Sequence, residues 1–331
     1  MNPIQPITSR PREISVAEPV SPALERVKRI LFKPFNLGKW FTIGFCAWLA
    51  GLGEGGGGGN FSQNFNQHHQ TNFGDSFRNH FWHARDYVLN NLGWIVPLAA
   101  LGLVIGLGLW LLFLWLNSRG KFMFLHCVAL DKAEVVEPWN QFAYEGNSLF
   151  LFRLCLGLIG MVLMLPFLGI AIVIVVKMFL SSQFLPGAII SAVGFGLLFI
   201  GMAIVFAIIH KLTADFVVPI MFLRRNRCLQ AWRELGALIS GRVGVFILYF
   251  LFQIVLCMAI GIIVLGAILI TCCIAGCLMI LPYIGTVLLL PVLIFKRSYS
   301  LYFLAQFGQE FNVFPPTAPP VPATPPIGLT A

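Results

Sequence analysis

The stretch VGVFILYFLFQIVLCMAIGIIVLGAILITCCIAGCLMILPYIGTVLLLPVLIF fills residues 243–295 and contains no Asp, Glu, Lys or Arg. A helix needs roughly 20 apolar residues to cross a hydrocarbon core about 30 Å thick, so this stretch is long enough for two spans and a short turn. The strands of membrane barrels are about ten residues long and alternate between apolar and polar side chains. The stretch therefore indicates two transmembrane helices.

Three more long stretches carry no charged residue, at residues 87–118, 154–176 and 178–210, and a shorter apolar stretch at 40–53 follows a basic segment. Each is long enough for one span, the shorter one barely so. Together they predict an all-α polytopic membrane helix bundle, with six transmembrane helices arranged as three hairpins. The expected spans are residues 36–53, 92–116, 149–176, 187–210, 243–266 and 273–295.

The overall composition excludes an ordinary soluble domain. Of the 331 residues, 58% are hydrophobic and 11% are charged, whereas soluble domains carry about 25% charged residues. A water-soluble fold of this length would have too little polar surface to cover its apolar residues. We therefore expect lipid to cover much of the chain.

The net charge of +9 is explained by topology and gives no reason to expect nucleic acid as a partner. In the six-span arrangement, all 22 basic residues except Arg78, Arg85 and Lys177 fall on one side of the membrane. Basic residues gather on the cytoplasmic side of membrane proteins. The pattern thus predicts that both termini are cytoplasmic, and it requires residues 36–53 to span the membrane.

Composition divides the chain into three parts. Residues 1–21 and the Pro-rich residues 312–331 are expected to be disordered tails, and residues 22–311 form the transmembrane domain, with an outer Gly/Asn/His-rich loop at 54–91. Short amphipathic segments at 22–35, 137–150 and 228–242 are expected on the cytoplasmic surface. In the first of them, Arg26, Arg29 and Lys33 form a basic face suited to the anionic headgroups of the lipid bilayer, the expected partner.

Polar side chains in or beside the expected spans are the candidate site residues, because burying them in lipid is costly. Lys211 and Asp215 are one helical turn apart and can form an ion pair, either as part of a transport path or as a structural pair at the membrane edge. Arg153 and Lys177 can extend their charges to the interface, and Gln253 suits a hydrogen bond between helices. The candidates are Arg153, Lys177, His210, Lys211, Asp215 and Gln253.

The outer loop contains His80 and His83, one turn apart and therefore weak candidates for metal binding. Their spacing matches no closed zinc signature, so we expect neither a metal nor another cofactor. The sequence also lacks His-Glu-x-x-His, Gly-x-Ser-x-Gly and a pair of aspartates at membrane depth. It therefore does not predict an enzyme.

Three strings carry a family resemblance: LFKPFNLGKWFTIGFCAWLAGLGEGGGGGNF from residue 31, NSRGKFMFLHCVA with PWNQF between residues 117 and 142, and PVLIFKRSYSLYFLAQFG from residue 291. They resemble uncharacterised bacterial multi-span membrane proteins, which are distantly similar to the membrane domain of some glycerophosphodiester phosphodiesterases. The chain lacks their catalytic domain, so the resemblance implies no hydrolase activity.

The resemblance implies a location in the bacterial inner membrane. We expect a non-enzymatic scaffold or accessory component, with an unidentified membrane protein as its partner. The main alternative is a transporter or permease for a small solute or a lipid. A third is a membrane enzyme that uses the outer histidines.

Overall fold

The computed structural model describes residues 14–52, 91–181, 186–271, 276, 278–279 and 281–314. All regular elements within these residues are helices. They are α1 (Val20–Phe32), α2 (Leu37–Gly51), α4 (Leu92–Leu130), α5 (Val136–Gln141), α6 (Ala143–Ser181), α7 (Pro186–Leu212), the π-helical turn η1 (Thr213–Val217), α8 (Val218–Arg224), α9 (Cys228–Gly241), α10 (Val243–Ile270), α12 (Pro282–Leu288), α13 (Leu290–Ala305) and the 3-10 turn η2 (Gln309–Phe311).

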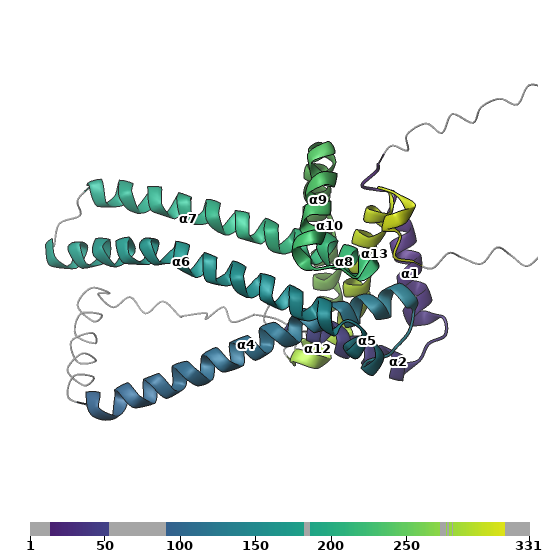
Figure 1. Ribbon diagram of the computed structural model, residues 1–331, viewed down its shortest axis with the longest axis horizontal. Coiled ribbons are helices and arrows are strands. Elements are labelled where there is room, and N and C mark those ends of the chain that lie inside the picture. The colour runs from purple at the N-terminus through teal and green to yellow at the C-terminus, as the bar shows by residue number, and fades with distance from the viewer. Residues whose placement is uncertain are drawn as a thin grey trace, which may run out of the picture.

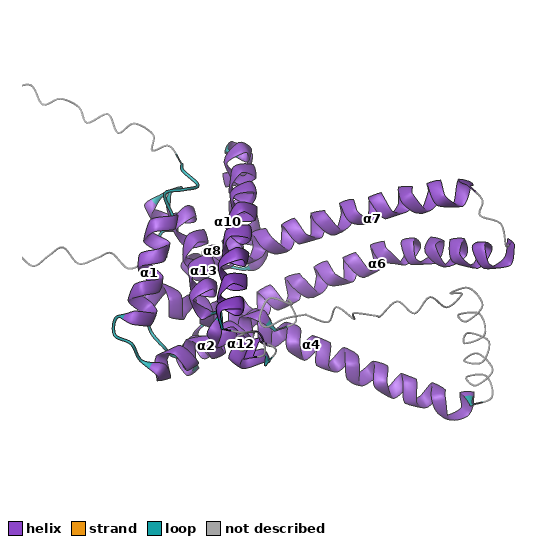
Figure 2. Cartoon of the chain, turned by 180° about the vertical axis from the view of Figure 1, so that it is seen from behind, coloured by secondary structure: helices purple, strands orange, loops and turns teal. Residues whose placement is uncertain are grey.

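Most of the helices form two regions, and α9 and α10 stand where the two regions meet, running across the direction of α6 and α7 (Figure 1). One region projects toward the left in Figure 1 and consists of the first part of α4 together with most of α6 and most of α7. At the other side α1, α2, α5, α8, α12, α13 and the last part of α4 gather into a compact group, which we call the helical body. The view from behind shows the same division (Figure 2).

Four helical segments within the described residues are long and apolar enough to cross a membrane: Gly93–Leu130, Ala143–Phe167, Val193–Arg224 and Val243–Ile270. They overlap the expected spans 92–116, 149–176, 187–210 and 243–266. In the most apolar 18 residues of each segment, almost no side chain is buried by the rest of the described chain. Such surface is stable in lipid or against other helices but not in water, so the chain is a multi-pass membrane protein.

The structure does not confirm the first expected span, residues 36–53. This segment forms α2, whose 15 residues extend about 22 Å at 1.5 Å per residue, short of the hydrocarbon core. It lies beside the second half of α4: Lys39 contacts Asp131 at one end, and Asn117 contacts Ala50 at the other. The apolar face of α2 thus packs on protein. Residue composition alone does not distinguish a helix that packs on protein from one that packs on lipid.

The sixth expected span, residues 273–295, is not confirmed either. Residues 272–275, 277 and 280 lie outside the described residues, and the rest of the segment divides between α12 and the start of α13. Each of these two helices has a proline in its first turn, Pro282 and Pro291, where the missing N–H costs no helical hydrogen bond. The arrangement of six spans as three hairpins therefore stays a prediction.

The helical body has its own core. An aromatic group is buried where η1, α10 and α13 meet, and Tyr249 and Phe303 have ring centroids 4.5 Å apart within it. A second part of the core lies between α1, α2 and α4 and includes Ile30, Ile43 and Leu125, all fully buried. This packing is dense enough to fix the positions of the polar groups at the ends of the long helices.

Both ends of the described chain are attached to this body. Ser15 donates its N–H to Gln306 Oε1 over 2.8 Å, and Gln306 Nε2 donates back to the Ser15 carbonyl over 2.9 Å. Tyr299 donates to the Val16 carbonyl over 2.9 Å. The first and last described residues therefore lie at the same end of the molecule.

Candidate functional site

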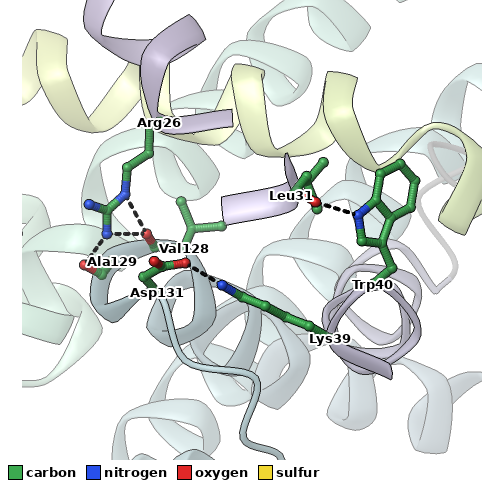
Figure 3. A network of polar contacts seen from close by, with 7 residues as sticks. All are labelled: Arg26, Leu31, Lys39, Trp40, Val128, Ala129 and Asp131. Carbon is green, nitrogen blue, oxygen red and sulfur yellow. Dashed lines mark hydrogen bonds and ion pairs between the residues drawn. The ribbon is translucent and has the colours of Figure 1, made fainter. Parts of the chain in front are cut away.

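The end of α4 is held by a buried arginine from α1 (Figure 3). Arg26 Nη2 donates to the Val128 carbonyl over 2.9 Å and to the Ala129 carbonyl over 2.7 Å, and its Nε also reaches Val128 over 3.2 Å. These carbonyls belong to the last turn of α4, where they have no partner within the helix. The negative end of the helix dipole attracts the guanidinium, so Arg26 caps α4.

This position corrects the expectation that Arg26 belongs to a basic face on lipid headgroups. Arg26 is only 8% exposed. Burial lowers the pKa of the Arg26 guanidinium from its usual value, but an arginine remains charged at neutral pH. A helical wheel cannot separate a buried capping arginine from a solvated one, because the acceptors lie about one hundred residues later in the chain.

A second contact fixes α2 against the same turn (Figure 3). Asp131 has a left-handed backbone, with φ of 59°, at the end of α4. Its carboxylate accepts a hydrogen bond from Lys39 Nζ over 2.8 Å. Trp40, the next residue of α2, donates from Nε1 to the Leu31 carbonyl at the end of α1 over 3.0 Å. The ends of α1 and α4 and the start of α2 are thus bonded together.

A third group joins α2, α4, α6 and α7. Asn117 is fully buried and donates to the Ala50 and Leu52 carbonyls over 2.7 Å each. Its Oδ1 accepts a hydrogen bond from Arg153 Nη1, and Arg153 Nη2 lies 3.1 Å from His210 Nε2. An arginine can only donate, so His210 Nε2 accepts in this contact. Arg153 and His210, separate candidates in the sequence, therefore belong to one network.

The chain passes from α7 into α8 through a π-helical turn, and Pro219 explains it. The Val218 N–H donates to the Thr213 carbonyl, five residues back. The next carbonyl, that of Ala214, would need the N–H of residue 219, which proline lacks. Arg297 of α13 supplies the missing donor from its Nη1 atom. Burial lowers the pKa of the Arg297 guanidinium to about 10, and the nearby Asp215 carboxylate opposes this shift.

The π-helical turn contains Asp215, the centre of a polar chain. Lys211 Nζ lies 2.9 Å from Asp215 Oδ2, which confirms the ion pair that their spacing predicts. The same oxygen accepts a hydrogen bond from the Tyr249 hydroxyl over 3.0 Å, and that hydroxyl accepts one from Gln253 Nε2 over 2.9 Å. Gln253 thus reaches η1 through Tyr249, a residue of its own helix, rather than directly.

A cavity of about 300 Å³ lies beside this chain. Its charged lining residues are Lys121 of α4, Lys211 of α7, Asp215 of η1, and Lys296 and Arg297 of α13. Its remaining lining residues are Ala47, Ala50, Gly51, Phe124, Ala214 and Leu293. We call it the cationic pocket, because four basic side chains face one carboxylate.

Four of the predicted site residues thus lie in two polar groups of one region, with Gln253 attached to the second group through Tyr249. The Lys177 side chain, His80 and His83 lie outside what the structure describes. No group of three or more potential metal ligands occurs within the parts of the chain that the structure covers. Sequence analysis missed Lys121, Lys296, Arg297 and Tyr249 as site residues. Pro219, which the sequence shows directly, was a usable signal for an irregular turn beside Asp215.

Comparison with known proteins places the chain in a family. Residues 14–314 match a family of unknown function, DUF7544. The chain belongs to this family. No curated protein and no solved structure matches it.

The DUF7544 match begins and ends with the described residues of the helical body, so it includes every residue of the cationic pocket. It agrees with the expected resemblance to uncharacterised proteins. The more distant similarity to the membrane domain of glycerophosphodiester phosphodiesterases stays a prediction.

Proposed function

We propose that this DUF7544 chain is a non-enzymatic scaffold or accessory component of a bacterial inner membrane, with both termini cytoplasmic. The observation that carries the proposal is the way its ionisable groups are used. Arg26 and Arg297 bind backbone carbonyls, Arg153 binds Asn117 and His210, and Lys211 binds Asp215. Each contact joins separate helices or stabilises an irregular turn, so these charged groups serve to hold the fold together.

The position of these contacts supports the same proposal. All of them lie in or beside the helical body, where the apolar segments of α4, α6 and α7 end. A carrier holds polar groups near the membrane midplane, where the substrate binds. The described apolar segments Gly93–Leu116 of α4 and Val193–Ile209 of α7 contain no charged residue. The alternative is a transporter of a small solute or lipid, which the cationic pocket favours.

Thiol accessibility distinguishes the two functions. In a chain whose native cysteines are replaced, we expect Gly157→Cys and Phe206→Cys to react slowly with a charged, membrane-impermeant thiol reagent. Gly157 of α6 faces Trp110 of α4, and Phe206 of α7 faces Gly160 of α6. Both positions therefore lie between projecting helices, where a water-filled path would pass. The measurement is the labelling rate in open membrane fragments.

Two further positions calibrate this experiment. Lys132→Cys, on the exposed surface of the helical body, should react rapidly, and Leu163→Cys, on an outward face of α6, should remain unlabelled. Labelling of either interhelical position at the rate of Lys132→Cys would replace the scaffold proposal with transport.

Orientation is tested separately. A cytoplasm-active reporter fused after Ala331 should be active, and an export-dependent reporter at the same position should be inactive, because basic residues are retained on the cytoplasmic side. At Gln67 we expect the opposite pair of results. An active export-dependent reporter after Ala331 would place the helical body outside the cytoplasm and reject this orientation.

A further inference from the structure

The cationic pocket is formed by segments far apart in the sequence. Lys121 comes from α4, Lys211 from the end of α7, and Lys296 and Arg297 from α13, while Ala47 and Ala50 of α2 form an apolar wall. The charges meet because α2 packs closely on α4 and because Pro219 opens the turn that Arg297 closes. None of these residues is needed for the four apolar spans themselves.

Basic side chains outnumber carboxylates among the described lining residues of the pocket. Asp215 is the one carboxylate among the lining residues that the structure describes, and it already binds Lys211 and the Tyr249 hydroxyl. Among the described residues, the Nε atom of Arg297 is buried and has no hydrogen-bond partner. Basic groups gathered in one pocket repel one another unless an opposite charge accompanies them. The lining therefore favours occupancy by an anion.

The place of the pocket along the helices indicates which anion. Lys121 follows the apolar segment of α4 by a few residues, and Lys211 directly follows that of α7. Basic side chains at the end of an apolar segment extend toward the layer of lipid phosphates, which is where we place the pocket. Basic pockets between transmembrane helices bind phospholipid headgroups in this layer. The apolar wall of Ala47, Ala50 and Leu293 suits the adjoining glycerol and acyl carbons.

We propose that the cationic pocket binds the phosphate group of an anionic phospholipid. Lys121, Lys296 and Arg297 supply the positive charge, and Lys211 is shared between the phosphate and Asp215. Ammonium and guanidinium groups form charge-assisted hydrogen bonds to phosphate oxygens. This site is independent of the scaffold proposal, because a scaffold and a transporter could each hold such a lipid.

The test uses the full chain in nanodiscs of phosphatidylcholine, to which a short-chain phosphatidylglycerol or inorganic phosphate is added. A ligand that binds the folded state raises the unfolding temperature with its concentration. We expect phosphatidylglycerol to raise it and to saturate. In Lys296→Gln, the concentration that produces half of the effect should rise about tenfold or more, since one charge-assisted contact is lost.

Lys132→Gln is the matched control, because Lys132 lies on the exposed surface of the body and outside the pocket. It should retain the full effect of phosphatidylglycerol. Without added lipid, Lys296→Gln should unfold at the wild-type temperature or above, because it relieves repulsion between cations. If Lys296→Gln does not fold, Lys121→Gln makes the same comparison.

The two sources of phosphate give different results. An effect of inorganic phosphate that Lys296→Gln weakens and Lys132→Gln leaves intact would support a phosphate site filled by the free ion. An effect of phosphatidylglycerol alone, with the same dependence on Lys296, supports the lipid. The absence of an effect with either compound, or an equal effect in Lys296→Gln and wild type, would overturn the proposal.

Discussion

Gly120→Ala is expected to destabilise the protein by about 3 kcal/mol, because added volume at a tight contact forces the backbone to move. A Cβ atom at this position would lie 2.6 Å from the Leu49 carbonyl carbon and 2.7 Å from the Ala50 nitrogen. Both are backbone atoms, so α2 as a whole would have to shift away from α4. The hydrogen bond from Asn117 to the Ala50 carbonyl would be lost with it.

The measurement is the midpoint of thermal unfolding in detergent, which we expect to fall by about 8 °C. Gly106→Ala is the matched control on the same helix, because an added Cβ there has nothing within 4 Å. Alanine favours a helix over glycine by up to about 1 kcal/mol, so the control should be unchanged or slightly more stable. Equal midpoints for the two variants would contradict the close packing of α2 on α4.

Arg26→Met should lower the stability by about 2–3 kcal/mol, the usual cost of losing hydrogen bonds from a charged group to buried acceptors. Methionine keeps much of the apolar volume but cannot donate to the carbonyls of Val128 and Ala129. The favourable charge at the negative end of α4 also disappears. The same unfolding measurement in detergent applies.

Arg29→Met provides the comparison, since Arg29 lies one turn further along α1 and is exposed. Removing it changes the net charge by the same amount but breaks no buried contact, so the stability should change by no more than about 0.5 kcal/mol. If the two variants lose equal stability, charge alone matters and Arg26 does not cap α4.

Hydropathy was sufficient to predict the helical class and four of the spans. A helix satisfies its own backbone hydrogen bonds, so a continuous apolar stretch has few other stable structures in lipid. The ion pair between Lys211 and Asp215 was predictable for a similar reason, because residues four apart in a helix are neighbours whatever surrounds them. Each of these predictions depends on local geometry alone.

The same reasoning did not identify the protein contacts of α2 and of Arg26. Residues 36–53 have the apolar composition of a short transmembrane span, but in the structure this segment packs against the second half of α4. Arg26 has the position of a surface residue on a helical wheel, but its acceptors are the carbonyls at the far end of another helix. In both cases the local residue pattern does not show whether the helix face contacts lipid, water or protein.

The sequence alone therefore determines that this chain is a helical membrane protein, and that α4, α6, α7 and α10 contain segments long and apolar enough to cross a membrane. Tertiary structure decides that Lys121, Lys211, Lys296 and Arg297 surround one cavity. The physical reason is the separation along the chain of the residues that interact. The hydrophobic effect and helical hydrogen bonds act on residues close together in the chain, whereas the pocket depends on close packing at Gly120 and on a carbonyl that Pro219 leaves for Arg297.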